Sequence, residues 1–119
     1  MAMEKFKFEN LNVYQETLAL IELVYSTTKK WPKEELFGLT NQIRRAIVSI
    51  ALNIAEGTSR TKKDFRHFLD LARGSVYESV AILQIAEKQG YISPQELEKL
   101  YRELIKISKM VSALKNSLI

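Results

Sequence analysis

The amino-acid sequence predicts an all-α fold, an antiparallel up-down bundle of four helices. Apolar residues recur at alternating spacings of three and four in four successive stretches, which is the period of a helix with one buried face. Only two prolines and four glycines interrupt the 119 residues, and this favours long helices over many short strands. Short connections join the four stretches, so neighbouring helices are expected to run in opposite directions within one domain, residues 1–119.

Composition limits the kinds of site that the protein can contain. The chain has no cysteine, which excludes disulfides, thiolate metal sites and cysteine nucleophiles. A formal net charge of +4 is compatible with a nucleic-acid partner, although many basic proteins bind no polyanion. No apolar run approaches the roughly 20 residues that span a bilayer, and no signal-peptide pattern opens the chain. We therefore expect no membrane partner and a cytoplasmic location.

The first helix is expected over residues 11–30, after a loosely packed lead-in segment. Asn10 or Asn12 is its expected cap. Pro32 ends it, because proline cannot continue the helical hydrogen-bond ladder. Its predicted core stripe consists of Leu11, Tyr14, Leu18, Ile21 and Tyr25. The connection that follows has expected apolar anchors in Trp31, Leu36 and Phe37.

The second helix, expected over residues 36–56 with Gly57 as its C′ residue, is apolar on almost all sides. One seam, expected to fill the core of the subunit, consists of Ile43, Ile47, Ile50 and Ile54. Apolar surface on the other side comes from Val48, Leu52 and Ala55. A helix of this kind is expected to be buried on more than one side. Because a small chain has few spare elements, a partner subunit is expected to cover this second side.

The third and fourth helices are expected over residues 62–89 and 94–118. Thr61 and Asp64 match a capping box at the start of the third helix, and Gly90 is its expected C′ residue. Its main seam consists of Phe65, Leu69, Ala72, Val76, Leu83 and Ala86, and a second flank of Phe68, Leu71, Ile82 and Ile85. Ser93 and Glu96 form a further capping box around Pro94. The stripe that follows consists of Leu97, Leu100, Leu104, Ile107, Val111, Leu114 and Leu118.

Polar side chains form a narrow stripe on the second helix and a matching set on the third. The members are Arg45, Ser49, Asn53 and Glu56, with Arg44 to one side, and Ser75 and Glu78. Arg44 or Arg45 is expected to pair with Glu56 or Glu78. The set is either a binding pocket with paired carboxylates or a satisfied polar network that fixes helix register or the subunit interface, and we favour the network. The sequence leaves open whether the stripe faces the bundle core or a neighbouring subunit.

A basic cluster surrounds the turn between the second and third helices. Its members are Arg60, Lys62, Lys63, Arg66 and Arg73, and only Asp64 and Asp70 oppose them. The functional interpretation is sequence-independent contact with nucleic-acid phosphates, which a symmetric ring of subunits would multiply. The alternative is an ordinary solvated helix end. No aromatic residues are interleaved in a way that indicates base stacking.

No residue set in the sequence indicates catalysis, a metal or a cofactor. A di-metal carboxylate bundle needs a Glu-x-x-His motif on each of two helices, and the only histidine, His67, is preceded at that spacing by Asp64. The same two residues build no serine-protease-like triad. We therefore expect a protein that is not an enzyme.

Gly74 lies in the middle of the third helix, where glycine costs about 1 kcal/mol relative to alanine. Such a cost favours close approach of another group. Trp31, Phe37 and a neighbouring subunit are the expected candidates, and a simple bend in the helix is the competing explanation.

These residues resemble a known family over essentially the whole chain. The matching segments are Leu11 to Tyr14, Trp31-Pro32, Phe37 to Ala46, Ser49 to Gly57, Phe65, Phe68-Leu69, Ala72 to Ser75 with Glu78, and Gly90 to Ile92. Together they are similar to the 23S rRNA intervening-sequence proteins, some of which are encoded inside inserts in the large ribosomal RNA gene. The chain departs from the family pattern in having Trp31 before Pro32, and Ala51-Leu52 in place of Pro-Ala.

The resemblance implies a non-enzymatic four-helix bundle that assembles into a homopentameric ring. The function we expect is binding of RNA or another nucleic acid through the basic cluster of each subunit. The alternative is an accessory scaffold for a protein partner, such as the reverse transcriptase of a diversity-generating retroelement, whose accessory protein has a related fold. This alternative rests on fold analogy, which does not by itself transfer function.

Overall fold

The computed structural model describes residues 3–119, and the elements within this range are all helical. Four long helices, α1 (Asn12–Thr28), α2 (Leu39–Thr58), α3 (Lys62–Lys88) and α4 (Pro94–Asn116), follow one another along the chain. Two short 3₁₀ helices, η1 (Lys7–Asn10) and η2 (Lys33–Glu35), precede α1 and α2. The predicted all-α class and the four helices are confirmed, with α3 and α4 each within two residues of the predicted bounds.

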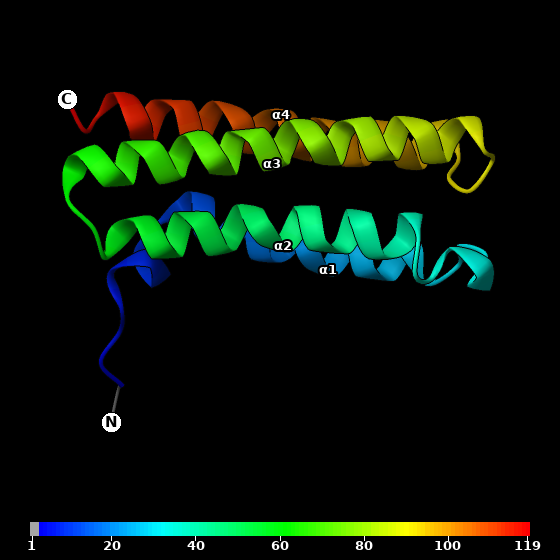
Figure 1. Cartoon of the computed structure of the whole chain (residues 1–119), viewed down its shortest axis with the longest axis horizontal. Helices are drawn as coiled ribbons and strands as arrows, with labels where there is room; N and C mark the ends of the chain where they lie inside the picture. Colours follow the sequence, from blue (N-terminus) through cyan, green and yellow to red (C-terminus); the bar gives the residue numbers. More distant parts are fainter. Residues whose placement is uncertain (1–2) are drawn as a thin grey trace.

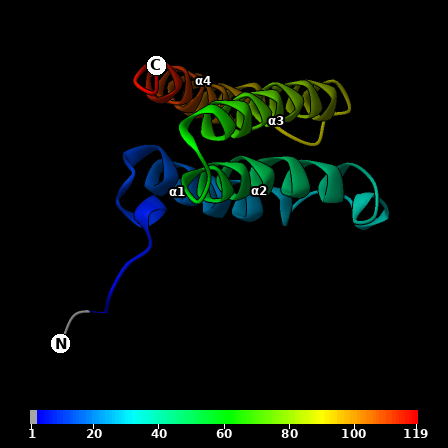
Figure 2. The same ribbon diagram turned by 60° about the vertical axis from the view of Figure 1, so that its left-hand side comes forward.

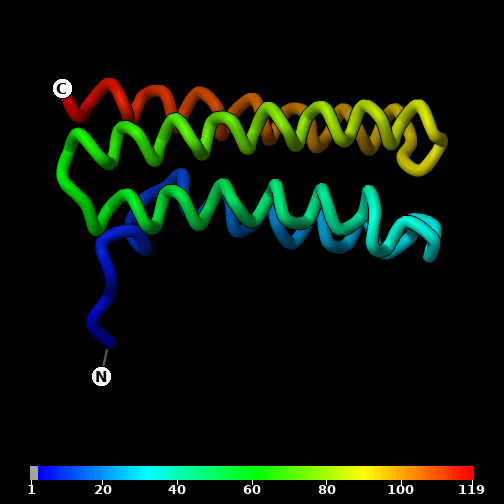
Figure 3. Tube along the Cα trace, viewed as in Figure 1, coloured from blue at the N-terminus to red at the C-terminus, as the bar shows by residue number. Residues whose placement is uncertain are grey.

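The four helices lie side by side, and the chain changes direction at each connection (Figures 1 and 3). Each helix packs against two others, so that α1, α2, α3 and α4 form a closed circuit with α4 returning to α1. Turning the molecule shows the α1–α2 pair as one layer and the α3–α4 pair as the other (Figure 2). The end of α2, the start of α3 and η1 therefore meet at one end of the bundle, while η2 and the α3–α4 connection lie at the other.

The core follows the seam predicted for the second helix. Ile43, Ile47, Ile50 and Ile54 are completely buried. Residues of the predicted α3 and α4 stripes pack around them, including Leu69, Ala72, Val76, Leu83, Ala86, Leu100, Leu104, Ile107 and Val111. Removing apolar side chains of this kind from water is the main favourable term in folding.

The predicted core stripe of the first helix is only partly right, since Leu11, Tyr14 and Ile21 are half-buried against the core but do not form its centre. The buried residues of α1 are Val13, Thr17, Leu20, Val24 and Thr28. Leu18 and Tyr25, which were expected in the core, are exposed. The hydroxyls of Thr17 and Thr28 donate to the carbonyls of Val13 and Val24 at 2.7 and 2.8 Å, so both polar groups are buried without losing hydrogen bonds.

The ends of α1 also differ from expectation. Leu11 is the N-cap residue and makes no side-chain cap, so neither Asn10 nor Asn12 caps the helix. The segment before it is ordered as η1, and the Phe8 ring packs edge-on against Tyr14 with ring centres 4.9 Å apart. After α1, Trp31 is buried as predicted, but Leu36 is about half exposed and Phe37 is 92% exposed. Phe37 is therefore no anchor within the subunit.

The start of α2 is held by a residue that the sequence did not indicate. Glu35 accepts a hydrogen bond from the backbone N–H of Leu39 at 3.1 Å, and its other oxygen accepts one from the Tyr91 hydroxyl at 2.9 Å. The hydrogen bond to Glu35 and partial burial raise the pKa of Tyr91. The Tyr91 ring also lies beside Trp31, with ring centres 6.0 Å apart. The connections at this end of the bundle are therefore tied together.

Gly57 is not the C′ residue of α2, because the helix continues to Thr58 and Gly57 is buried within it. A Cβ at this position would lie 2.6 Å from Cδ1 of Phe65 and 3.0 Å from Cβ of Phe68. The glycine therefore allows the first turns of α3 to pack closely against α2.

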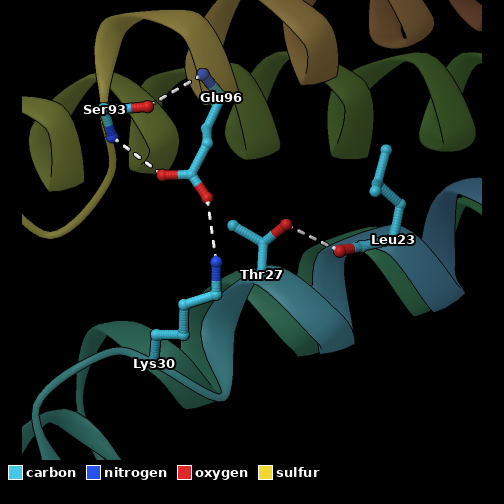
Figure 4. Close-up of polar contacts among 5 residues, drawn as sticks. All are labelled: Leu23, Thr27, Lys30, Ser93 and Glu96. Atoms are coloured by element: carbon cyan, nitrogen blue, oxygen red, sulfur yellow. Dashed lines mark hydrogen bonds and ion pairs between the residues drawn. The ribbon is translucent and has the colours of Figure 1, made fainter.

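The start of α4 and the end of α3 match the predictions. Gly90 has a φ of 78°, and Tyr91 N–H donates to the Ala86 carbonyl at 2.9 Å, as in a Schellman motif. Ser93 and Glu96 form the reciprocal capping box, shown in Figure 4. Glu96 also lies 3.6 Å from the ammonium group of Lys30, at the end of α1. Hydrogen bonding to Ser93 is the main cause that lowers the pKa of Glu96.

Candidate nucleic-acid interface

Two members of the basic cluster are exposed at the start of α3. Lys62 and Lys63 occupy the first turn, behind the N-cap Thr61, whose hydroxyl accepts a hydrogen bond from Asp64 N–H at 3.2 Å. Among the residues that the structure describes, neither lysine has a carboxylate within ion-pair distance. Both positive charges are therefore directed to solvent and accessible to an anionic partner.

The three arginines of the cluster contact other groups of the subunit. Arg60 is paired with Glu56 and lies over the Phe68 ring at 5.3 Å, and the hydrogen bond to Glu56 raises the pKa of Arg60. Arg66 donates to the Lys115 carbonyl at 3.0 Å, which joins the start of α3 to the end of α4. Arg73 lies over the Tyr77 ring at 5.0 Å and donates to its hydroxyl. Within the subunit, the three arginine side chains are therefore positioned by other groups, in contrast to Lys62 and Lys63.

A small hollow brings part of the cluster together with the N-terminal segment. It has a volume of about 260 Å³ and lies between η1 and the α2–α3 turn. Its lining residues are Lys7, Leu11, Thr58, Arg60, Lys62 and Phe65, and we call it the basic hollow. The sequence reasoning missed Lys7, because only the fold brings the lead-in segment next to residues 58–65.

The polar network is assembled only in part. Ser75 donates to the Ser49 hydroxyl at 2.9 Å, and the Asn53 amide donates to the same hydroxyl at 3.0 Å and to the Ser49 carbonyl. Arg45 and Glu78 line one groove of about 470 Å³ but are not paired with each other among residues 3–119. Ser75 is buried and Ser49 and Asn53 are half-buried between α2 and α3, whereas Arg45 and Glu78 are exposed.

The predicted ion pairs of this network are wrong. Arg44 donates instead to the Thr28 hydroxyl at 3.0 Å and lies over the Tyr25 ring, so it joins α2 to α1. Glu56 is occupied by Arg60, four residues further along the chain. The sequence pattern placed these charges on the right helices, but the partner of each depends on side-chain directions that spacing alone does not determine.

The described residues contain no group of three histidine, cysteine, aspartate or glutamate side chains close enough to hold a metal ion. His67 is exposed, with its ring 6.0 Å from that of Phe68. Within residues 3–119, none of the helices has the length and apolar character needed to cross a membrane.

Comparison with known proteins gives one family and a fold. The family model described as 23S rRNA-intervening sequence protein matches residues 9–113. The chain is also similar to a crystal structure of a protein with unknown function from the S23 ribosomal protein family of Bacteroides thetaiotaomicron, with 22% sequence identity and a TM-score of 0.78. That match covers 87% of this chain and 95% of the other. No curated protein matches the chain.

Proposed function

Because the chain belongs to the 23S rRNA-intervening sequence protein family, we propose that it is a non-enzymatic RNA-binding protein of the cytoplasm. In this proposal the subunit is an antiparallel up-down bundle that assembles into a cyclic homo-oligomer, most simply a pentamer. The basic cluster at the start of α3 provides the RNA contacts, repeated once per subunit around the ring.

The observation that carries RNA binding is the exposed pair Lys62 and Lys63. Their charges are unpaired within the described part of the chain, and the basic hollow adds Lys7 and Arg60 beside them. Lysine and arginine side chains bind phosphates largely irrespective of sequence, and each contact releases counterions. Binding through this surface is therefore expected to weaken steeply as salt is added.

Charge reversal tests this proposal. The double variant Lys62→Glu/Lys63→Glu should reduce affinity for a structured RNA by at least about a hundredfold, since each lost phosphate contact is amplified by repulsion. A matched control, Lys99→Glu/Lys109→Glu, changes two exposed lysines of α4 and should bind RNA like the wild type. Fluorescence anisotropy at several salt concentrations measures the RNA affinity of each double variant. Undiminished binding by the α3 variant would exclude this surface.

Assembly is supported by the outer side of α3. Leu71, Tyr77 and Ile85 are about half exposed, and Leu52 of α2 and Phe37 are more so. Gly74 lies among these side chains, and a Cβ at this position would have nothing within 4 Å. Neither Trp31 nor Phe37 therefore approaches Gly74 closely enough within the subunit to require a glycine there. The remaining expected partner is a neighbouring subunit packed closely on this side. Arg45 and Glu78, of opposite charge and unpaired with each other, could each find the other on a second copy.

The alternative function, a scaffold for a protein such as a reverse transcriptase, is favoured by a surface outside the basic cluster, which shares Tyr77 with the side of α3 proposed for assembly. An apolar groove of about 380 Å³ lies between α3 and α4, with Tyr77, Tyr101 and Ile105 among its lining residues. A reverse transcriptase gene beside this gene would favour the scaffold strongly. The purified pair should then form a complex that Ile105→Glu disrupts and the Lys62→Glu/Lys63→Glu variant does not. Loss of the complex in the lysine variant alone would contradict docking in the groove.

A further inference from the structure

The basic hollow differs from a simple charged surface, because both positive and apolar side chains line it. Lys7, Arg60 and Lys62 come from η1, the α2–α3 turn and the first turn of α3. Leu11 and Phe65 supply the apolar part of the lining. Phosphates alone require only the cations, so the apolar side chains favour a ligand that also has a flat or apolar part.

We propose that the basic hollow binds one unpaired nucleotide of single-stranded RNA, with its base against Leu11 and Phe65 and its phosphate among the three cations. The inference rests on the proposed RNA binding and specifies the form of RNA that is bound. A hollow of about 260 Å³ has room for one small group and none for a duplex. RNA bases are accessible in loops, bulges and ends, where they can be splayed out and stacked against protein side chains.

The polar groups around the hollow keep free hydrogen-bond donors and positive charges that can bind a phosphate. Lys7 and Lys62 are without an ion-pair partner in the described range of the chain. One terminal nitrogen of Arg60 binds Glu56, but a guanidinium group has five N–H donors, so others remain for a ligand. The Thr58 hydroxyl donates to the Ala55 carbonyl at 2.7 Å, which leaves its oxygen as an acceptor for a ribose hydroxyl.

The residue that distinguishes the hollow from the rest of the basic cluster is Lys7. Lys7→Glu should weaken binding of a fluorescein-labelled single-stranded RNA 12-mer by about tenfold and lower its salt slope by about one. Affinity for a 12-base-pair RNA duplex should change by less than about threefold, because a duplex does not enter the hollow and is held mainly by Lys63, which does not line it. Lys33→Glu is the matched control, since Lys33 is also the exposed first residue of a 3₁₀ helix, at the other end of the bundle.

A second arm keeps the protein unchanged and alters the RNA. An abasic ribose-phosphate 12-mer retains the phosphates and should bind the wild-type protein about tenfold more weakly than the normal 12-mer, because the base contact is lost. Lys7→Glu should then have the same effect on both oligomers, since it acts on the phosphate. Equal affinity of the wild type for the abasic and normal oligomers would overturn the proposed base contact.

The outcomes separate this inference from the proposed function. If Lys7→Glu weakens single-stranded and duplex RNA equally, or neither, the hollow is not a nucleotide site, although RNA binding through Lys62 and Lys63 stands. If the wild-type protein binds none of these RNAs at low salt, the proposed function fails and the inference fails with it. Circular dichroism and thermal unfolding of each variant confirm that affinity changes do not come from unfolding.

Discussion

At the scale of single residues, two glycines inside helices have opposite environments. Gly57 is buried against the first turns of α3, and a Cβ there would lie 2.6 Å from the Phe65 ring. Gly74 lies on the outer side of α3, and a Cβ there would have nothing within 4 Å. The same substitution at the two positions is therefore expected to change stability in opposite directions.

Gly57→Ala should lower the free energy of unfolding by about 1–3 kcal/mol, because the added methyl group forces Phe65 or the helices apart. Gly74→Ala should raise it by about 0.5–1 kcal/mol, because alanine restricts the unfolded chain and favours the helix. Urea denaturation, at protein concentrations where subunits are dissociated, measures both. A stabilised Gly57→Ala protein would show that the α2–α3 contact is looser than described.

The residues of the candidate interface show where sequence reasoning reaches its limit. Lys62 and Lys63 were predicted correctly as exposed charges, because the first turn of a helix is a local feature. Arg66 contacts Lys115, 49 positions away, and Lys7 reaches the hollow through the fold alone. Such partners depend on tertiary packing and have no local sequence signal.

At the scale of elements, the seam of α2 could be predicted and that of α1 could not. The isoleucines of α2 form an unbroken row at helical spacing, and all four are completely buried. In α1 two neighbouring rows compete, and the buried row contains Thr17 and Thr28. Threonine appears polar in a sequence, yet its hydroxyl can bond the carbonyl four residues earlier and then be buried among apolar groups.

Helix boundaries were predictable where local chemistry defines them. The capping box at Ser93 and the left-handed Gly90 depend on residues five positions apart or fewer. The predicted start of α2, residue 36, lies three residues before the observed one. The N-cap residue is Gly38, which has no side chain to cap the helix, and the first N–H of α2 binds Glu35 instead, so the usual capping signal is missing from the sequence.

The capping box gives a prediction with a defined pH dependence. In the folded protein the pKa of Glu96 lies below its ordinary value of 4.5, so its ionised form stabilises the fold above that pH and the contribution is lost as the pH falls through the folded pKa. Glu96→Gln should lower the free energy of unfolding by about 0.5–1 kcal/mol at pH 7. The difference from the wild type should shrink below pH 4.5.

Thermal or urea unfolding between pH 3 and 7 measures this effect. Glu98→Gln provides the control, because Glu98 is an exposed α4 glutamate whose partner Arg102 is four residues away in the same helix. Its effect on stability should be small at both ends of the range. If Glu96→Gln lowers the free energy of unfolding by the same amount from pH 3 to 7, the ionised carboxylate is not the source of the stabilisation.

At the scale of the whole molecule, the outer side of α3 exposes the apolar side chains of Leu71, Tyr77 and Ile85. If neighbouring subunits cover it, Phe37→Glu and Ile85→Glu should each dissociate the oligomer while the separated subunits stay helical, since both side chains are exposed within the subunit. Light scattering after size exclusion gives the mass. Leu18→Glu, a matched change on the exposed side of α1, should leave the assembly intact. A monomeric wild type at micromolar concentration would refute the assembly itself.

The double hydrogen bonding of Glu35 has a consequence for how the bundle opens. The two oxygens of one carboxylate hold the start of α2 and Tyr91, in the connection between α3 and α4, so any movement of Glu35 strains the hydrogen bonds to both. Local opening events that expose backbone amides should therefore begin elsewhere. In hydrogen–deuterium exchange, the amide of Leu39 should exchange as slowly as its helical neighbours, and Glu35→Ala should speed exchange near both Leu39 and Tyr91 together.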